Sequence, residues 1–237
     1  MFLYSRVTNG DGRLVKYLDA LVFDLDGVLI LGSNEEYINC VYYALRVSGI
    51  VCDYDVVKEQ IQKHWGVPHR YQLAYFLGRN GAALEKACAA YEQYLLSDKF
   101  LCKLRVLPGA VHLLETLRSN EYIVAVLSGM HPGLIQKIFE SHLPVGDLFK
   151  MVVSGYHNDL HLQKPNPQVL LQMIKDMGSD TSKTAYVGDS RRDMVMANKT
   201  NVTSVAVLTG LLSREEAEDL KVDYIVADAT DILRYLE

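Results

Sequence analysis

The chain has few of the features that mark secreted or zinc-binding proteins. Its 237 residues include four cysteines, and none of them stands in a CxxC pair. Cysteines paired at short spacings are typical of structural zinc sites and of disulfide frameworks. We therefore predict four reduced and mostly buried thiols in a cytoplasmic protein, at Cys40, Cys52, Cys88 and Cys102.

Long apolar runs and blocks of like charge are missing as well. No stretch approaches the ~18 apolar residues of a membrane-spanning helix, and residues 1–17 lack the apolar run of a signal peptide. The formal net charge is −5, and no basic block offers a footprint for nucleic acid. We expect neither a membrane nor a nucleic acid as a partner, and we expect residues 1–17 to be a short N-terminal extension.

Short aliphatic segments are present in number, and they alternate with helical patterns over residues 18–30 and 105–237. Such segments are typical of parallel strands that are buried on both faces. They lie at residues 20–23, 122–127, 151–153, 184–187, 204–208 and 224–226. This alternation predicts an α/β core, a doubly wound Rossmann-like sheet.

Residues 31–104 contain no such segment. Apolar residues recur there at helical spacing, as at Ile38, Tyr42 and Leu45. Gly66-Val67-Pro68 interrupts this pattern near its middle. We predict three or four helices inserted after the first strand, so that residues 31–104 form a helical cap on the core.

Two carboxylates follow the first predicted strand. Asp24 and Asp26 lie two residues apart, so on a strand their side chains point to the same side. Ligands of parallel sheets gather at the carboxyl ends of the strands. Two acids at that place repel each other unless a cation lies between them or one is protonated. The alternative is an Asp-rich turn without a chemical role.

A second acidic segment follows the predicted strand at 184–187. Asp189 comes at the strand end and Asp193 one helical turn later. Hard oxygen ligands at the ends of two neighbouring strands predict a Mg²⁺ site. For Asp193 the alternative is a helix N-terminus, where the helix dipole favours an acid.

Two weaker signals could bind phosphate. Ser128 follows the predicted strand at 122–127, where a hydroxyl and backbone N–H groups suit a phosphate oxygen, although an N-cap serine is the simpler interpretation. Lys164 precedes Pro165, which holds its backbone extended ahead of a helix. A lysine fixed beside carboxylates neutralises phosphate charge, whereas taken alone Lys164 would be a surface lysine.

The four segments, in this order, resemble the motifs of the haloacid dehalogenase-like hydrolase superfamily, most closely its phosphoglycolate phosphatase and β-phosphoglucomutase branch. The motifs are Asp24-Leu25-Asp26-Gly27, Ser128, Lys164-Pro165, and Gly188-Asp189 with Asp193. The resemblance covers residues 18–237. It implies a Mg²⁺-dependent phosphatase that hydrolyses a small phosphorylated metabolite through an aspartyl-phosphate on Asp24, beneath a helical cap.

The resemblance and the residue chemistry agree on the individual roles. Asp24 is the nucleophile, and Asp26 is the general acid and base. The metal ligands are Asp24, Asp189 and the backbone carbonyl of Asp26. Ser128 and Lys164 hold the other phosphoryl oxygens. Asp193 supports the site by orienting Lys164 or a metal-bound water.

The chain departs from the family pattern after the second motif. Ser128 is commonly followed by asparagine, and this chain has Gly129, so an amide that would hold the phosphoryl group is missing. The backbone at Gly129 is still expected to bind substrate. The missing amide keeps open the alternative of a binding or regulatory protein that has lost turnover.

The leaving group is expected to meet the break in the helical insert. Gly66 marks a tight turn there, Trp65 offers a flat apolar face, and His69 and Arg70 offer hydrogen-bond donors. The alternative is that Trp65 is core while His69 and Arg70 face water. Two other chemistries remain, a phosphomutase and a phosphonatase that would use Lys58 or Lys63.

Overall fold

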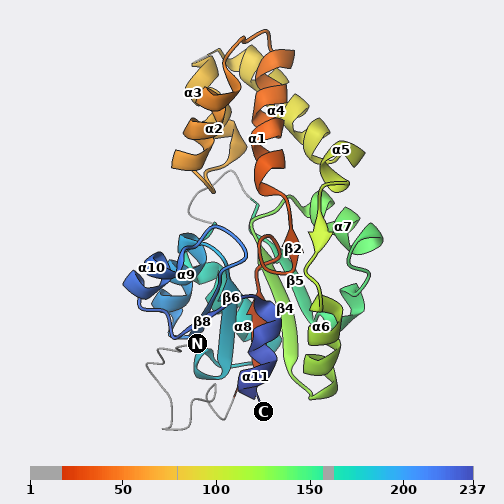
Figure 1. Cartoon of the computed structure of the whole chain (residues 1–237), viewed down its shortest axis with the longest axis vertical. Coiled ribbons are helices and arrows are strands. Elements are labelled where there is room, and N and C mark those ends of the chain that lie inside the picture. Colours follow the sequence, from red (N-terminus) through yellow and green to blue (C-terminus); the bar gives the residue numbers. More distant parts are fainter. Residues whose placement is uncertain (1–17, 79, 157–162, 237) are drawn as a thin grey trace.

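The computed structural model describes residues 18–78, 80–156 and 163–236, so the predicted N-terminal extension lies outside the described residues. A parallel sheet with helices on its two faces forms one end of the molecule, and helices α1–α4 form the other (Figure 1). Within the described ranges, no helix is both long and apolar enough to cross a membrane.

The main sheet has six strands in the order β5-β4-β1-β6-β7-β8, and every neighbouring pair is parallel. The strands are β1 (Ala20–Phe23), β4 (Ile123–Ser128), β5 (Met151–Ser154), β6 (Thr184–Gly188), β7 (Thr203–Val207) and β8 (Tyr224–Val226). The prediction of a doubly wound α/β fold is confirmed. Because β1 is central and β4 and β6 flank it, the residues that follow these three strands meet at one edge.

Each face of the sheet packs on its own helices. The helices are α6 (Ala110–Ser119), α7 (Pro132–Ser141), α8 (Pro167–Met177), α9 (Arg191–Thr200), α10 (Arg214–Asp219) and α11 (Leu233–Leu236), with short 3₁₀ turns η1 (Gly146–Leu148), η3 (Thr181–Lys183) and η4 (Ala229–Ile232). Leu21 and Phe23 of β1 belong to the cluster that includes α6 and α7. Val22, between them, belongs to the cluster with α8, α9 and α10. This alternation follows the period of two along a strand.

One strand departs from the predicted burial on both faces. In β5, Val152 keeps 39% of its surface exposed. β5 lies at the edge of the sheet and pairs only with β4 among the described strands. A run of aliphatic residues marks a strand but does not show whether the strand has one neighbour or two.

Residues 32–104, inserted after β1, are largely helical. The helices of this segment are α1 (Asn34–Val47), α2 (Tyr54–Lys63), α3 (His69–Leu77), α4 (Gly81–Leu95) and α5 (Asp98–Leu101). The prediction of three or four helices missed α5, which is a single turn. The antiparallel strands β2 (Ile30–Leu31) and β3 (Arg105–Val106) pair where the chain enters and leaves this helical segment. Its assignment as a separate cap domain stays a prediction.

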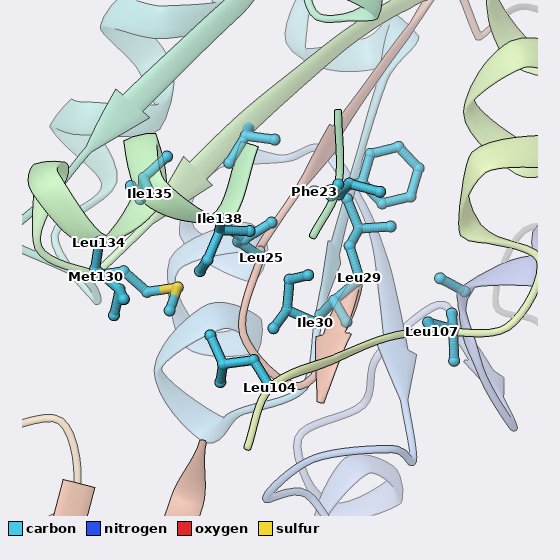
Figure 2. Close-up of a cluster of buried hydrophobic side chains, with 14 of the residues drawn as sticks. Phe23, Leu25, Leu29, Ile30, Leu104, Leu107, Met130, Leu134, Ile135 and Ile138 are labelled. Atoms are coloured by element: carbon cyan, nitrogen blue, oxygen red, sulfur yellow. The ribbon is translucent and has the colours of Figure 1, made fainter. Parts of the chain in front are cut away.

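A buried cluster holds the loop after β1 in place. Leu25, Leu29 and Ile30 from this loop pack with Met130 and with residues of α7 in one hydrophobic cluster (Figure 2). Leu25 is fully buried, although it stands between the two acids of the first motif. Its burial anchors the backbone that carries Asp24 and Asp26.

Candidate active site

Asp24 continues the direction of β1 at the carboxyl end of the sheet. Its backbone N–H donates to the carbonyl of Val187 at 2.8 Å, so the ladder between β1 and β6 extends to this residue. The Oδ1 atom accepts a hydrogen bond from the N–H of Leu25 at 2.7 Å. Burial raises the pKa of Asp24, while the charge of Lys164 opposes that rise. The carboxylate is therefore buried, oriented and held beside a cation.

Lys164 joins the first and fourth motifs. Its Nζ lies 2.8 Å from Asp24 Oδ2 and 2.8 Å from Asp193 Oδ1. All three side chains are buried. Burial alone would lower the pKa of Lys164, but the charges of Asp193 and Asp24 outweigh it and raise the pKa. The interpretation of Lys164 as a surface lysine is therefore wrong.

Asp193 has two functions, and both were considered from the sequence. It is the third residue of α9, and with Ser190 it forms a capping box. Its Oδ1 atom also accepts hydrogen bonds from Lys164 and, at 3.0 Å, from the hydroxyl of Tyr186. Burial would raise the pKa of Asp193, but Lys164, Ser190 and Tyr186 hold it below its usual range. Asp193 is therefore an ionised residue that fixes Lys164.

Asp189 lies between two glycines that leave room for its carboxylate. A Cβ atom at Gly27 would come within 2.2 Å of Asp189 Oδ2, and one at Gly210 within 1.7 Å. Oδ2 accepts one hydrogen bond, from the N–H of Leu211 at 3.1 Å. Burial, followed by the charges of Asp193, Asp24 and Asp26, raises the pKa of Asp189 well above its usual value. No cation among the described side chains forms an ion pair with it.

The acidic group suits a divalent cation. Carboxylate oxygens of Asp24, Asp189 and Asp193 all lie within 4.8 Å of one another. An all-oxygen donor set is the one that Mg²⁺ prefers. Because the oxygens of Asp193 already accept from Lys164, Ser190 and Tyr186, Asp24 and Asp189 are the better ligands. Uncompensated charge on Asp189 is what a bound cation would relieve.

The side chain of Asp26 makes its hydrogen bonds away from this cluster. It accepts a hydrogen bond from the hydroxyl of Ser33, and Tyr37 also hydrogen-bonds to it. Burial, reinforced by the charge of Asp24, raises the pKa of Asp26 to about 7, against the lowering effects of Ser33 and Tyr37. Its side chain is thus suited to proton transfer, and only its backbone is free for other roles.

Ser128 is the last residue of β4 and is fully buried. Its Oγ accepts a hydrogen bond from the N–H of Met130 at 3.3 Å. The interpretation of Ser128 as an N-cap is wrong, because His131 caps α7 by accepting from the N–H of Gly133. A Cβ atom at Gly129 would meet nothing within 4 Å. The missing amide therefore leaves open space beside Ser128.

The structure brings the predicted site residues together around one cavity of about 190 Å³. Its lining includes eight residues that were predicted from the sequence, namely Asp24, Asp26, Gly66, His69, Ser128, Gly129, Lys164 and Asp189. Asp193 is fully buried beneath Lys164. Trp65 also lines the cavity, as the sequence interpretation of the loop at 65–70 expected.

Arg70 and the two cap lysines do not line this cavity. Arg70 forms an ion pair with Glu85 on the surface of the helical segment. Lys58 pairs with Glu35 and Lys63 with Glu59, both as exposed pairs. The expectation that Arg70 binds the leaving group is wrong, and no observation supports a cap lysine as a phosphonatase nucleophile.

The lining also includes residues that the sequence did not indicate, among them Tyr91, His131, Tyr156 and Arg192. Tyr156 follows β5 by two residues, so the strand-end rule that located the acids could have found it. Arg192 donates to the backbone carbonyl of Lys164 and, at 3.4 Å, to Gln163 Oε1. A Cβ atom at Gly66 would lie 2.5 Å from Arg192 Nη1. Arg192 thus connects the segment of Lys164 with the loop at Gly66.

Comparison with known proteins gives this arrangement a family. Residues 21–207 match the model of the family described as haloacid dehalogenase-like hydrolase. The chain belongs to this family. The resemblance inferred from the four motifs is confirmed, and with it the prediction of a hydrolase.

Among curated relatives, the phosphoglycolate phosphatase of Pasteurella multocida is 28% identical over 91% of this chain and 96% of its own length. The glyceraldehyde 3-phosphate phosphatase of Methanopyrus kandleri is 24% identical over 81% of this chain and 85% of its own length. A phosphoglycolate phosphatase of Mannheimia succiniciproducens is matched over only 59% of its length. That these relatives are named phosphatases agrees with the prediction of a phosphoric monoester hydrolase.

Solved structures confirm the fold. A protein from Haemophilus somnus, described as a predicted phosphoglycolate phosphatase, superposes with a TM-score of 0.76 over 93% of this chain and 98% of its own. Its sequence is 20% identical. At that identity the likeness establishes the architecture, with the site residues argued from their own geometry.

Proposed function

We propose that this protein is a Mg²⁺-dependent phosphatase that hydrolyses a small phosphorylated metabolite through an aspartyl-phosphate on Asp24. One observation carries the proposal. Lys164 is buried between Asp24 and Asp193 at 2.8 Å from each, while Asp189 is buried beside them and pairs with no lysine or arginine among the described residues. This arrangement can receive one phosphoryl group together with one divalent ion.

In the first step, Asp24 attacks phosphorus in line and the P–O bond to the leaving group breaks. Lys164 and Ser128 hold phosphoryl oxygens at the carboxyl ends of the strands. Asp26 has a pKa of about 7, so a protonated fraction is present near neutrality and donates its proton to the leaving oxygen.

In the second step, Asp26 accepts a proton from a water molecule, and that water attacks the phosphorus of the aspartyl-phosphate. The P–O bond to Asp24 breaks, which restores its carboxylate and releases inorganic phosphate. Throughout, Asp193 keeps Lys164 in place through the 2.8 Å hydrogen bond.

Asp24, Asp189 and the backbone carbonyl of Asp26 would hold the Mg²⁺ ion. The ion supplies positive charge that offsets the repulsion between an anionic nucleophile and an anionic phosphate. The two glycines around Asp189 suit this role, because they keep its carboxylate at the edge of the cavity.

The leaving group would occupy the part of the cavity lined by the helical segment, where Trp65, Gly66 and His69 lie. The cavity of about 190 Å³ is smaller than the ~300 Å³ at which pockets for drug-sized ligands begin. A small metabolite fits this size. The named activities of the relatives, on phosphoglycolate and on glyceraldehyde 3-phosphate, fall in the same class.

The proposal is tested by Asp24→Asn, which keeps the size of the side chain and removes the nucleophile. We expect turnover of p-nitrophenyl phosphate to fall at least ~10³-fold while the protein stays folded. Asp147→Asn, on an exposed residue that does not line the cavity, is the matched control and should retain activity. Beryllium fluoride should occupy Asp24 in the unaltered protein.

The products distinguish this proposal from its alternatives. A phosphatase releases inorganic phosphate, whereas a phosphomutase returns the phosphoryl group to an isomer of the substrate. Wild-type activity that survives in Asp24→Asn, or no phosphate release from any phosphorylated metabolite, would contradict the proposed function.

A further inference from the structure

His69 is a buried histidine whose ring stacks on two tyrosines, Tyr91 and Tyr156. Only 7% of its surface is exposed. Its ring stacks on Tyr91 with a centroid separation of 4.4 Å and an interplanar angle of 8°. The hydroxyl of Tyr156 lies 2.9 Å from Nδ1. Burial, with smaller contributions from His131 and Arg70, lowers the pKa of His69 to about 4.

The chemistry of the two groups gives this hydrogen bond a direction. A neutral imidazole has one N–H donor and one bare nitrogen acceptor. The bare nitrogen is a stronger base than a phenol oxygen, and a phenol is the more acidic of the two donors. The favoured arrangement therefore has the Tyr156 hydroxyl donating to Nδ1, which leaves the proton of His69 on Nε2.

Nε2 of His69 is open to the cavity. The hydrogen bond to Tyr156 is the one that His69 makes within the described part of the chain. The buried side-chain atoms without a hydrogen-bond partner do not include Nε2. Because Nε2 has no such partner among the described residues, it must be accessible. His69 lines the cavity that contains Asp24. An N–H donor therefore faces the space where the leaving group would bind.

We propose that Tyr156 is a positioning residue that fixes His69 as an Nε2–H donor to an uncharged oxygen, a hydroxyl or a carbonyl, of the leaving group. This inference rests on the proposed function and names its substrate class. The substrates would be phosphorylated polyols, sugars or aldehydes. Phosphorylated carboxylic acids would be poor substrates.

The remaining walls favour an uncharged leaving group. Tyr37, Trp65 and Tyr91 line the cavity with rings, on which the C–H groups of a polyol can pack. The lysine and arginine in the described lining already hold other groups. Lys164 holds Asp24 and Asp193, and Arg192 holds the carbonyl of Lys164 and Gln163. A carboxylate buried against His69 would lose its hydration without gaining a free cation.

The kinetic test uses three substrates with Tyr156→Phe, which keeps the ring and removes the hydroxyl. The substrates are glycerol 3-phosphate, 2-phosphoglycolate and p-nitrophenyl phosphate. We expect wild-type kcat/KM to be at least ~10-fold higher on glycerol 3-phosphate than on 2-phosphoglycolate. In Tyr156→Phe, kcat/KM on glycerol 3-phosphate should fall ~10-fold further than on p-nitrophenyl phosphate.

Tyr94→Phe is the matched control. It also removes a tyrosine hydroxyl, which donates to Glu36 within the helical segment, but Tyr94 does not line the cavity. Its ratio of kcat/KM between substrates should equal that of the wild type. A wild-type preference for 2-phosphoglycolate, or an equal loss on all three substrates in Tyr156→Phe, would overturn the inference while leaving the proposed phosphatase intact.

A second measurement does not depend on turnover. The ¹⁵N chemical shifts of His69 should show a proton on Nε2 and a hydrogen-bonded, unprotonated Nδ1 in the wild type. Tyr156→Phe should shift the Nδ1 signal, and Tyr94→Phe should not. If the proton of wild-type His69 lies on Nδ1, the inference is overturned, whether or not any substrate is hydrolysed. Absence of hydrolysis is a separate result, and it would contradict the proposed function.

Discussion

The two ends of the cavity are built in opposite ways. At the end formed by the sheet, buried charges compensate one another, as Lys164 does between Asp24 and Asp193. At the end formed by the helical segment, rings predominate and His69 is held neutral by burial. The charged end is suited to a phosphoryl group that all substrates of such an enzyme share. The aromatic end is suited to the part in which substrates differ.

Among the residues of the charged end, Asp193 should have the largest effect on stability. Asp193→Asn leaves Lys164 with one carboxylate partner and weakens the capping box of α9. Removing one partner from a buried ion pair typically costs about 3–5 kcal/mol. We expect a loss of this order in the free energy of unfolding, measured with urea, together with a strong loss of turnover.

Tyr186→Phe is the comparison for this prediction, because it removes the hydroxyl that donates to Asp193 at 3.0 Å and to the carbonyl of Leu127 at 3.3 Å, and it keeps both carboxylate partners of Lys164. Its expected cost is about 1–2 kcal/mol. If the two variants were equally stable, Asp193 would not be the residue that compensates Lys164.

The contribution of His69, at the aromatic end, to the stability of the protein should depend on pH. The pKa of His69 is about 4 in the folded protein, against 6.5 for an ordinary histidine, so the unfolded chain binds a proton first as the pH falls. The stability that His69 contributes is complete above pH 6.5 and is lost progressively toward pH 4, by up to about 3 kcal/mol. The difference in unfolding free energy between wild type and His69→Gln should therefore change across this window.

Asp24, Asp26 and Asp189 have raised pKa values and therefore favour the folded protein as the pH falls. Because these acids are present in both proteins, the difference between wild type and His69→Gln reports on His69 alone. A pH-independent difference between the two proteins would show that His69 titrates in the folded state as it does in the unfolded chain.

Asp189 should show the effect of a carboxylate that pairs with no cationic side chain in the described part of the chain. In Asp189→Asn we expect the Mg²⁺ concentration for half-maximal activity to rise by at least ~10-fold. The same variant should unfold at a higher temperature than the wild type in EDTA, because it removes a buried carboxylate whose pKa is raised by burial and by neighbouring acids. A lower melting temperature in EDTA would mean that Asp189 is stabilised without metal.

The smallest effect is expected at Arg70, which is adjacent to His69 but outside the cavity. Arg70→Ala removes an exposed ion pair with Glu85, and such pairs contribute little to stability. We expect kcat/KM to stay within ~2-fold of wild type on each of the three substrates. A selective loss on one substrate would show that Arg70 contacts the leaving group of that substrate.

The charged end could be predicted from the sequence because Asp24 and Asp189 follow their strands directly, and Asp26 and Asp193 come a few residues later. Strand ends are local features, and the parallel order of β1, β4 and β6 then brings them together. The aromatic end could not be predicted in this way. The contact between His69 and Tyr156 joins residues that are 87 positions apart, and no local pattern encodes it.

The error at Arg70 has a simple geometric origin. His69 and Arg70 are neighbours in α3, and successive residues of a helix point about 100° apart. Only one of the two can face the cavity. The break at Gly66-Val67-Pro68 located the approach of the helical segment to the site, but not which face of the following helix would be turned toward it.

The ladder between β2 and β3 has a mechanical consequence. The two connections between the sheet and helices α1–α5 run side by side as paired two-residue strands, and a Cβ atom at Gly32 would come within 2.5 Å of the carbonyl of Lys103. Two paired segments of the chain at such close range cannot slide past each other without breaking their hydrogen bonds. The ladder therefore fixes the place at which helices α1–α5 leave and rejoin the core, close to the strand that leads to Asp24.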